Sequence, residues 1–229
     1  MRQAVTLSLG VGMAAVAALA VGCGRSPAPQ GSSGPASAPP PSTPGKSTAP
    51  ATSAPTSRAP GSKAVLMVIA QKSFRDEELL TPKKAFESAG HSVTVVAPST
   101  ATATGMLGAK VTPDGTIKDA ESAKYDAVVF VGGSGATALF DDRDAHRLAR
   151  EAVEGGKVVG AICLAPSILA RAGLLKGKRA TVWKSESKTL ESGGATYTGE
   201  PVTVDGKLVT GNGPEAAAEF ADELLKQLK

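Results

Sequence analysis

The stretch Lys157-Val-Val-Gly-Ala-Ile-Cys-Leu-Ala-Pro166 decides how the rest of the chain is interpreted. Val158 to Ile162 is a short, branched apolar run of the kind that a buried parallel strand requires. Leu164 to Ala172 follows as a predicted helix, in which Pro166 is tolerated because the first turn has spare N–H groups. We therefore expect the side chain of Cys163 at the carboxyl edge of a sheet, facing the start of a helix.

A cysteine at this junction can be a nucleophile or a core residue. The positive end of a helix dipole favours thiolate over thiol, which would make Cys163 a better nucleophile. A small buried residue of the core is, however, the commonest role of a free cysteine. The segment by itself does not choose between the two.

The composition divides the chain into two parts. Ten of the 16 prolines lie between Pro27 and Pro60, and no Asp or Glu precedes Asp76. Residues 63–229 carry 21 basic and 21 acidic residues, so the net charge of +4 and the pI near 9.1 belong to the N-terminal part. This distribution, with only 3% aromatic residues, argues against a nucleic-acid-binding domain. The four basic residues of the first part are Arg2, Arg25, Lys46 and Arg58.

The N-terminus has the layout of a secretory signal, because one positive charge precedes a continuous apolar or small stretch from Ala4 to Gly22. Ala20-Val-Gly-Cys23 resembles the lipobox of bacterial lipoproteins, in which the Cys is acylated and becomes the mature N-terminus. We therefore predict a lipoprotein signal peptide at residues 1–22 and a lipid anchor, such as palmitate, on Cys23 at the outer side of a bacterial cell membrane. A cleaved signal that releases a secreted protein and an uncleaved membrane helix are the alternatives.

Residues 23–62 predict a disordered tether rich in Pro, Ser, Thr and Ala, and residues 63–229 predict a single domain. The chain has two cysteines, so lipidation of Cys23 would leave Cys163 without a partner in the same chain. An unpaired thiol in an oxidising compartment is either hidden or used. This context favours a functional role for Cys163.

Strands and helices alternate within the domain. This alternation predicts an α/β fold with a doubly wound, mainly parallel sheet, whose sites lie beyond the carboxyl ends of its strands. The predicted helix at 76–89 places Leu79, Leu80 and Phe86 on its inner face. The other predicted helices span 142–154, 164–172 and 214–228. The predicted strands are a central strand at 64–70, strands at 92–97, 127–131, 158–162 and 179–183, short antiparallel strands within 105–118, and a pair at 202–204 and 208–210.

Segments 74–78, 132–135 and Cys163 each follow a predicted strand and are expected close together. Glu78 would either share a proton with the thiol or be an acidic residue that the first turn of a helix favours for electrostatic reasons. The turn at 132–135 would let backbone N–H groups approach a substrate oxygen, although a tight turn without a ligand looks the same. It also fits a dinucleotide-binding pattern loosely, but the next strand ends in Cys163 rather than in an acidic residue.

Neither histidine is expected to act as a base. His91 precedes a strand and so lies at the opposite edge of the sheet from Cys163, and His146 lies one turn into a surface helix. Two histidines and one free cysteine have no metal-ligand spacing. We expect neither a metal nor another cofactor.

Several blocks of the domain resemble the ThiJ/PfpI (DJ-1/PfpI) family of the class I glutamine amidotransferase-like superfamily. They agree in order and spacing over nearly all of residues 63–229. The resemblance implies a flavodoxin-like three-layer sandwich with Cys163 as the nucleophile, Glu78 as the carboxyl group that holds the thiolate, and an oxyanion site lined by the N–H groups of Gly133 and Leu164. The matching blocks are Phe74–Pro82, Ala89–Val93, Tyr125–Gly133, Val158–Lys178 and Val204–Pro214.

Two positions depart from the family pattern. Protease-like members have a His directly after the nucleophile, where this chain has Leu164, and other members supply a His further along, at a position that counting gives as Trp183. A PfpI-type cysteine peptidase is therefore the least expected activity.

The pair of Cys163 and Glu78 could still add to a reactive carbonyl such as an α-oxoaldehyde, in glyoxalase- or deglycase-like stress-related chemistry. A redox-responsive stress protein without turnover and a binding module with a vestigial site are the alternatives, so enzymatic activity stays open. The expected partners are a small reactive carbonyl or an oxidant, and the membrane through the N-terminal lipid. The resemblance also implies a homodimer, which this family commonly forms.

Overall fold

The structure is a computed structural model that describes residues 61–229. The predicted signal peptide, the lipobox with Cys23 and nearly all of the predicted tether lie outside the described residues. Within the described part, no helix has both the length and the apolar character needed to cross a bilayer.

A seven-stranded sheet organises the described residues, with the strand order β11-β12-β8-β7-β1-β3-β6. All neighbouring pairs are parallel except β11 and β12. The prediction of a doubly wound, mainly parallel sheet is therefore confirmed. The strands are β1 (Ala64–Val68), β3 (Ser92–Ala97), β6 (Gly115–Thr116), β7 (Ala127–Phe130), β8 (Val158–Ile162), β11 (Val202–Asp205) and β12 (Leu208–Gly211).

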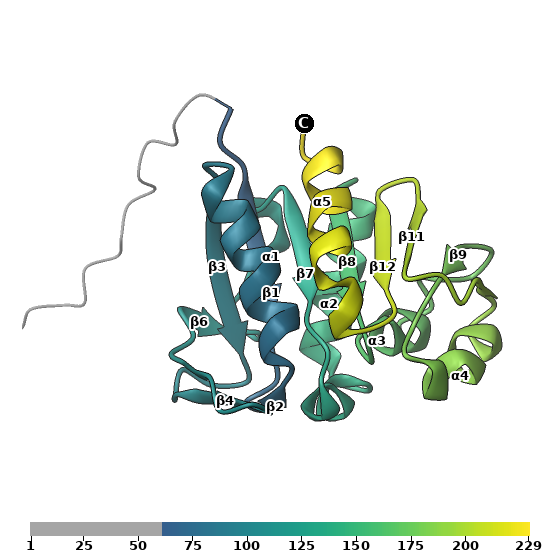
Figure 1. Ribbon diagram of the computed structural model, residues 1–229, viewed down its shortest axis with the longest axis horizontal. Helices are drawn as coiled ribbons and strands as arrows, with labels where there is room; N and C mark the ends of the chain where they lie inside the picture. Colours follow the sequence, from purple (N-terminus) through teal and green to yellow (C-terminus); the bar gives the residue numbers. More distant parts are fainter. Residues whose placement is uncertain (1–60) are drawn as a thin grey trace, which may run out of the picture. The chain divides into compact units, whose positions relative to one another are not determined.

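Helices cover both faces of this sheet (Figure 1). On one face lie α1 (Asp76–Ser88) and α5 (Ala217–Gln227), and on the other lie α2 (Arg143–Glu154) and α3 (Pro166–Arg171). Alternate side chains of β1 pack into the two layers: Val65 and Met67 join the core under α1 and α5, whereas Leu66 and Val68 join the core under α2 and α3. Burial on both faces explains why the strand is uniformly apolar.

Two small sheets flank the main one. The order of one is β2-β4-β5, in which β4 and β5 are antiparallel, and the other pairs β9 with β10. The prediction of short antiparallel strands within 105–118 is confirmed only in part, because β4 begins before this range and β6, which lies within it, pairs in parallel with β3. The predicted strand at 179–183 is thus shorter and lies outside the main sheet. Near the second small sheet lies α4 (Ser187–Ser192), which the sequence did not predict. The strands are β2 (Lys72–Phe74), β4 (Ala103–Gly105), β5 (Lys110–Val111), β9 (Arg179–Ala180) and β10 (Thr196–Tyr197).

The helices also differ from prediction in three details. The segment after Cys163 is a turn, and α3 begins only at Pro166. Residues Pro214–Ala216 form a 3₁₀ turn (η4) before α5. The prediction that Leu80 lies on the inner face of α1 is wrong, because this side chain is 46% exposed.

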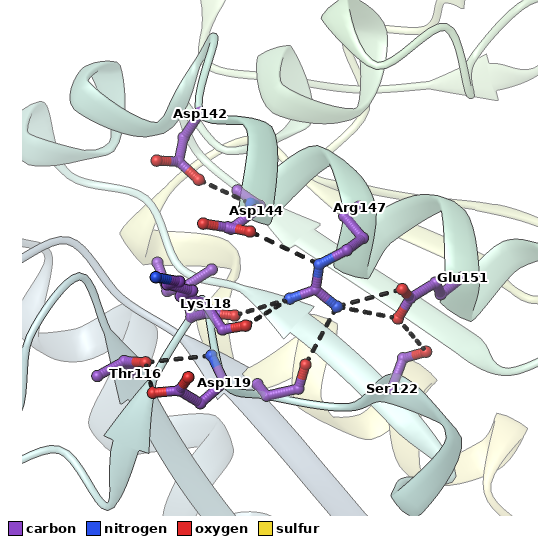
Figure 2. Close-up of polar contacts among 11 residues, drawn as sticks. Thr116, Lys118, Asp119, Ser122, Asp142, Asp144, Arg147 and Glu151 are labelled. Carbon is purple, nitrogen blue, oxygen red and sulfur yellow. Dashed lines mark hydrogen bonds and ion pairs between the residues drawn. The ribbon is translucent and has the colours of Figure 1, made fainter.

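One arginine fastens α2 to the connection between β6 and β7. The guanidinium group of Arg147 donates hydrogen bonds to the backbone oxygens of Ile117, Lys118 and Ala120 at 3.0–3.2 Å, and it pairs with Glu151 on the next turn (Figure 2). These hydrogen bonds satisfy backbone oxygens that lie between β6 and β7 and are not part of a strand. Arg147 therefore links one helix to a loop that is distant in sequence.

Candidate functional site

The topology brings the three predicted site segments to one edge of the sheet. Strands β1, β7 and β8 are parallel neighbours, so the residues that follow them leave the sheet side by side. The segment after β1 leads through β2 to Glu78 in α1, the segment after β7 is the turn at 132–135, and Cys163 directly follows β8. The site is therefore assembled from loops held by buried strands.

Cys163 has a strained backbone. Its φ angle is +61°, and Ser73 is the only other described non-glycine residue with a positive φ. Hydrogen bonds hold the residue on both sides: its N–H donates to the oxygen of Gly211, and its own oxygen accepts from the N–H of Trp183, both at 2.9 Å. Such conformations cost of order 1–3 kcal/mol and persist where the surrounding structure fixes them, often at active sites.

Glu78 is completely buried next to this cysteine. Its Oε2 accepts the N–H of Gly132 at 3.1 Å, and its carboxyl group lies within hydrogen-bonding reach of the Cys163 thiol. Its Oε1 has no N–H or O–H donor among the described residues, so this oxygen is free to carry a proton. Gly132 is required for this approach, because a Cβ atom there would lie 2.6 Å from both Glu78 Oε2 and the Cβ of Cys163.

Burial dominates the protonation of both groups. It raises the pKa of Glu78 from 4.5 to about 7, against the opposing hydrogen bonds with Cys163 and Gly132. Burial, together with the negative charge of Glu78, raises the pKa of the Cys163 thiol from 9.0 to about 12. A helix start favours thiolate at this position, and burial acts on the pKa of the thiol in the opposite direction. The helix begins at Pro166, two residues later than expected, and burial outweighs the N–H groups near the sulfur.

The two groups instead form a coupled pair. Two negative charges side by side are strongly disfavoured in a buried site, so the thiol and the carboxyl group share protons rather than ionise together. A carboxyl group with a pKa near 7 can accept the thiol proton as the sulfur reacts, and can return that proton afterwards. The arrangement suits a thiol activated by its neighbour rather than a permanent thiolate.

The N–H groups of Gly133 and Leu164 both donate hydrogen bonds to the sulfur of Cys163 and lower its pKa. Gly133 has a φ of +94° and lies so close to β2 that a Cβ atom would be 2.4 Å from the nitrogen of Arg75. A glycine is therefore needed to bring this N–H group to the sulfur. The structure thus places both predicted backbone donors at the sulfur of Cys163.

Cys163 is 8% exposed and opens onto a pocket of about 340 Å³. The described lining combines apolar side chains with one positive and one negative charge. Its members are Arg75, Met106, Gly133, Ser134, Cys163, Leu164, Trp183, Ser185, Pro214 and Glu215. The volume suits a small molecule.

Sequence reasoning missed three residues that shape this pocket. Met106 comes from the β4–β5 hairpin, and Arg75 lies beside the pocket in an ion pair with Glu77 at 2.9 Å. The buried carboxylate of Asp76 accepts the N–H groups of Leu107 and Ala109 at 2.8 and 2.7 Å, which fixes the hairpin that carries Met106. No sequence pattern connects these positions. The burial of an acidic residue, Asp76, identifies the contact, and this burial is known only from the structure.

The histidines lie away from the described pocket lining. Nδ1 of His91 accepts the N–H of Lys63 at 3.3 Å, at the start of β1 and so at the opposite edge of the sheet, as predicted. His146 Nε2 lies 2.7 Å from the oxygen of Phe140. Within residues 61–229, no group of His, Cys, Asp and Glu has the arrangement of a metal site.

Comparisons with known proteins agree with this geometry. Residues 63–227 match the DJ-1/PfpI family. An uncharacterized protein of Methanocaldococcus jannaschii is 45% identical over 168 residues, which cover 72% of this chain and 82% of that protein. The Bacillus subtilis protein named "Putative cysteine protease YraA" is 35% identical over 165 residues, covering 72% of this chain and 98% of its own length. The crystal structure of a ThiJ/PfpI domain protein from Brachyspira murdochii matches with a TM-score of 0.71 at 34% identity, covering 73% of this chain and 96% of that one.

Proposed function

The chain belongs to the DJ-1/PfpI family, and on that premise we propose that it is an exported, membrane-tethered enzyme that converts small reactive carbonyls through Cys163. The observation that carries the proposal is a cysteine on a strained turn, open to a pocket and paired with a buried carboxyl group whose pKa is about 7. Such a pair provides a nucleophile and a proton acceptor without a histidine.

We assign the following roles for an α-oxoaldehyde substrate. The sulfur of Cys163 attacks the aldehyde carbon, the C–S bond forms, and the electron pair of the C=O double bond moves to oxygen. Glu78 takes the thiol proton and gives it to that oxygen, with the N–H groups of Gly133 and Leu164 stabilising the negative charge. Glu78, now ionised, removes the proton of the former aldehyde carbon, and the electron pair of that C–H bond forms a C=C bond as the adjacent carbonyl oxygen takes the proton of the new hydroxyl group. Glu78 then returns its proton to the adjacent carbon, the C=C electron pair forms that C–H bond, and the remaining oxygen becomes the carbonyl oxygen of a thioester. Water hydrolyses the thioester to a 2-hydroxy acid and restores the thiol.

The test is turnover of methylglyoxal by the wild-type protein and two variants. Cys163→Ala should abolish turnover, and Glu78→Gln should lower kcat by about 100-fold or more, because general acid–base catalysis contributes about 10²–10⁴-fold. Unchanged turnover in Cys163→Ala would refute the proposal.

Alkylation of Cys163 by iodoacetamide separates the effect of Glu78 on the pKa of the thiol from its role in proton transfer during turnover. Replacing Glu78 with Gln removes the negative charge that raises the pKa of the thiol. The thiolate fraction at pH 7.5, and with it the alkylation rate, should therefore increase in Glu78→Gln although turnover falls. A slower alkylation in this variant would show that the carboxyl group instead supports a pre-formed thiolate.

A redox-responsive protein without turnover is the second candidate. It is supported by a free thiol that opens onto a pocket and is already surrounded by N–H donors, which could also bind sulfinate oxygens. Mild peroxide should then add two oxygen atoms, about 32 Da, to Cys163, since the cysteine has no resolving partner among the described residues. A thiol that resists both peroxide and alkylation would exclude this candidate and favour a vestigial site.

A peptidase activity like that in the name of the Bacillus subtilis relative is the weaker candidate. Expulsion of an amine requires a proton donor near the nucleophile, and the described pocket lining contains no histidine. Leu164 and Trp183 occupy the two positions at which the family pattern leads one to expect an imidazole.

A further inference from the structure

Trp183 lies next to the nucleophile with much of its indole ring uncovered. The backbone N–H of Trp183 donates to the backbone oxygen of Cys163 at 2.9 Å, so the backbone of Trp183 is fixed relative to the sulfur. Its benzo ring lies against Gly213, where a Cβ atom would be 2.9 Å from Cε3 and Cζ3. The residue nevertheless remains 44% exposed, and it lines the pocket of Cys163. An indole that is supported by Gly213 and still largely exposed beside the pocket can contact a flat apolar group.

Met106 contributes a second apolar group to the same pocket. The described residues expose five large hydrophobic side chains, and two of them, Met106 and Trp183, line this pocket. Met106 is 45% exposed yet held in place, because its N–H donates to the oxygen of Phe74 at 2.8 Å and its Sδ accepts the N–H of Ser134 at 3.5 Å. Leu164 and Pro214 continue the apolar lining. Thioether sulfur and aromatic rings both attract aromatic groups.

The charges in the described pocket lining oppose each other. Arg75 is the one cation, and its Nε and Nη2 are already engaged by the carboxylate of Glu77. Glu215 supplies a negative charge within the same lining. The pocket therefore has no surplus of positive charge with which to attract a phosphorylated or acidic carbonyl, and a neutral substrate suits it better.

We propose that Trp183 and Met106 form an aryl-binding wall, so that the site prefers neutral α-oxoaldehydes with an aromatic substituent over those with a methyl group. The inference rests on the proposed function and specifies its substrate class. The aldehyde carbon would lie at the sulfur of Cys163 while the aromatic ring lies against the indole. Trp183 is then a specificity-determining residue, in the position where a histidine would have served proton transfer.

The first experiment compares kcat/KM for phenylglyoxal and methylglyoxal, with initial rates so that the slower reaction of these reagents with arginine does not contribute. The wild-type protein should favour phenylglyoxal by about tenfold or more, in the range that apolar pocket contacts provide. Trp183→Ala should bring the ratio close to one, mainly through phenylglyoxal, whereas Trp183→Phe should retain most of the preference. Val153→Ala is the matched control, because Val153 is 44% exposed, as Trp183 is, and does not line this pocket.

The second experiment measures binding without turnover. Acetophenone and acetone share a ketone and differ in a phenyl or methyl group, so each is tested for protection of Cys163 against iodoacetamide. Acetophenone should protect at concentrations about tenfold lower than acetone, and Trp183→Ala should remove this difference. Equal protection by the two ketones in the wild-type protein would overturn the inference.

The two experiments distinguish failure of the inference from failure of the proposed function. If the protein turns over methylglyoxal but Trp183→Ala changes the ratio of kcat/KM for phenylglyoxal to that for methylglyoxal by less than about twofold, the aryl-binding wall is refuted and the proposed function stands. Absence of turnover with both aldehydes would refute the proposed function, and the protection experiment would then still decide whether the pocket selects aromatic groups.

Discussion

At the scale of single residues, the site depends on a buried carboxyl group that is stable when it is protonated. Glu78 lies where its Oε2 accepts one backbone N–H while Oε1 can hold a proton. Burial raises its pKa to about 7, so the group is balanced between acid and base at neutral pH. The same burial that prepares Glu78 for proton transfer must reduce the stability of the fold whenever the group ionises.

We therefore expect unfolding of the domain to depend on pH through Glu78. Its pKa is about 7 in the folded state against 4.5 ordinarily, so the folded protein holds this proton more tightly. The stabilisation is fully present below pH 4.5 and is lost as pH rises through about 7, and it amounts to about 3 kcal/mol. Urea unfolding of the wild-type protein and Glu78→Gln from pH 4.5 to 8 should show the variant gaining stability relative to wild type over this window.

Glu87→Gln is the matched control for this prediction. Glu87 lies on the same helix, is exposed and pairs with Lys83, so its replacement should change stability by less than about 1 kcal/mol at any pH. Parallel pH profiles for the wild-type protein and Glu78→Gln would show that Glu78 titrates in the folded state as it does in the unfolded chain.

At the scale of elements, the β4–β5 hairpin reaches the pocket only because Asp76 fixes it. The Asp76 carboxylate lies over Gly105, where a Cβ atom would be 2.4 Å from Oδ2, and it accepts the N–H groups of Leu107 and Ala109. Asp76→Ala should cost about 1–3 kcal/mol, since two N–H groups lose a charged acceptor. Hydrogen exchange at Leu107 and Ala109 should accelerate, and the preference for aromatic substrates should weaken as Met106 becomes mobile.

Asp222→Ala serves as the control for the hairpin, because Asp222 is an exposed acidic residue of α5. Its replacement should leave the free energy of unfolding within about 0.5 kcal/mol of wild type. If Asp76→Ala leaves exchange at Leu107 and Ala109 unchanged, the hairpin is held by its backbone pairing and not by the carboxylate.

A second element-scale prediction concerns the connection between β6 and β7. Arg147 donates to three backbone oxygens of this connection (Figure 2), so Arg147→Ala should cost about 1–2 kcal/mol in urea unfolding. Hydrogen exchange should accelerate within residues 117–122. Arg143→Ala is the comparison, because Arg143 is an exposed arginine of the same helix that makes no hydrogen bond or ion pair within the described residues. Equal losses in the two variants would mean that the bonds to the loop contribute nothing measurable.

The elements that the sequence predicted correctly are those with a strong local pattern. The buried strands β1, β7 and β8 are continuous apolar runs, and these runs also placed Cys163 and Glu78 near each other. The misplacement of Leu80 came from two adjacent leucines in α1. A helix buries one face, and Leu79, Pro82 and Phe86 occupy that face at helical spacing.

Other features of the site have no local pattern. The thiol pKa depends on burial by elements distant in sequence, which the position of Cys163 at a strand–helix junction does not reveal. Met106 and Trp183 line one pocket although they follow β4 and β9, which belong to two separate small sheets. Neither strand is longer than three residues, which is too short for a periodicity to appear.

At the scale of the whole molecule, residues 63–229 contain all the apolar packing that the structure describes. The buried residues of the two hydrophobic cores run from Val65 to Leu228, and every residue of the candidate site lies in the same range. The catalytic proposal therefore concerns this domain, whereas the proposal of export concerns residues 1–62. The two can be tested independently.

Replacing Cys23 with Ser tests the proposed anchor in a bacterial host. A lipid buries apolar carbon at about 0.8 kcal/mol per CH₂ group, so the wild-type protein should remain in the membrane fraction at about 1 M salt, which screens any attraction by the basic residues near the N-terminus. Cys23→Ser should lose labelled palmitate and leave the membrane, while the purified variant keeps the wild-type turnover because the proposed catalytic residues all lie within residues 63–229. A variant still held by the membrane at high salt would indicate an uncleaved helix instead, and wild-type protein found in the medium would indicate an ordinary cleaved signal.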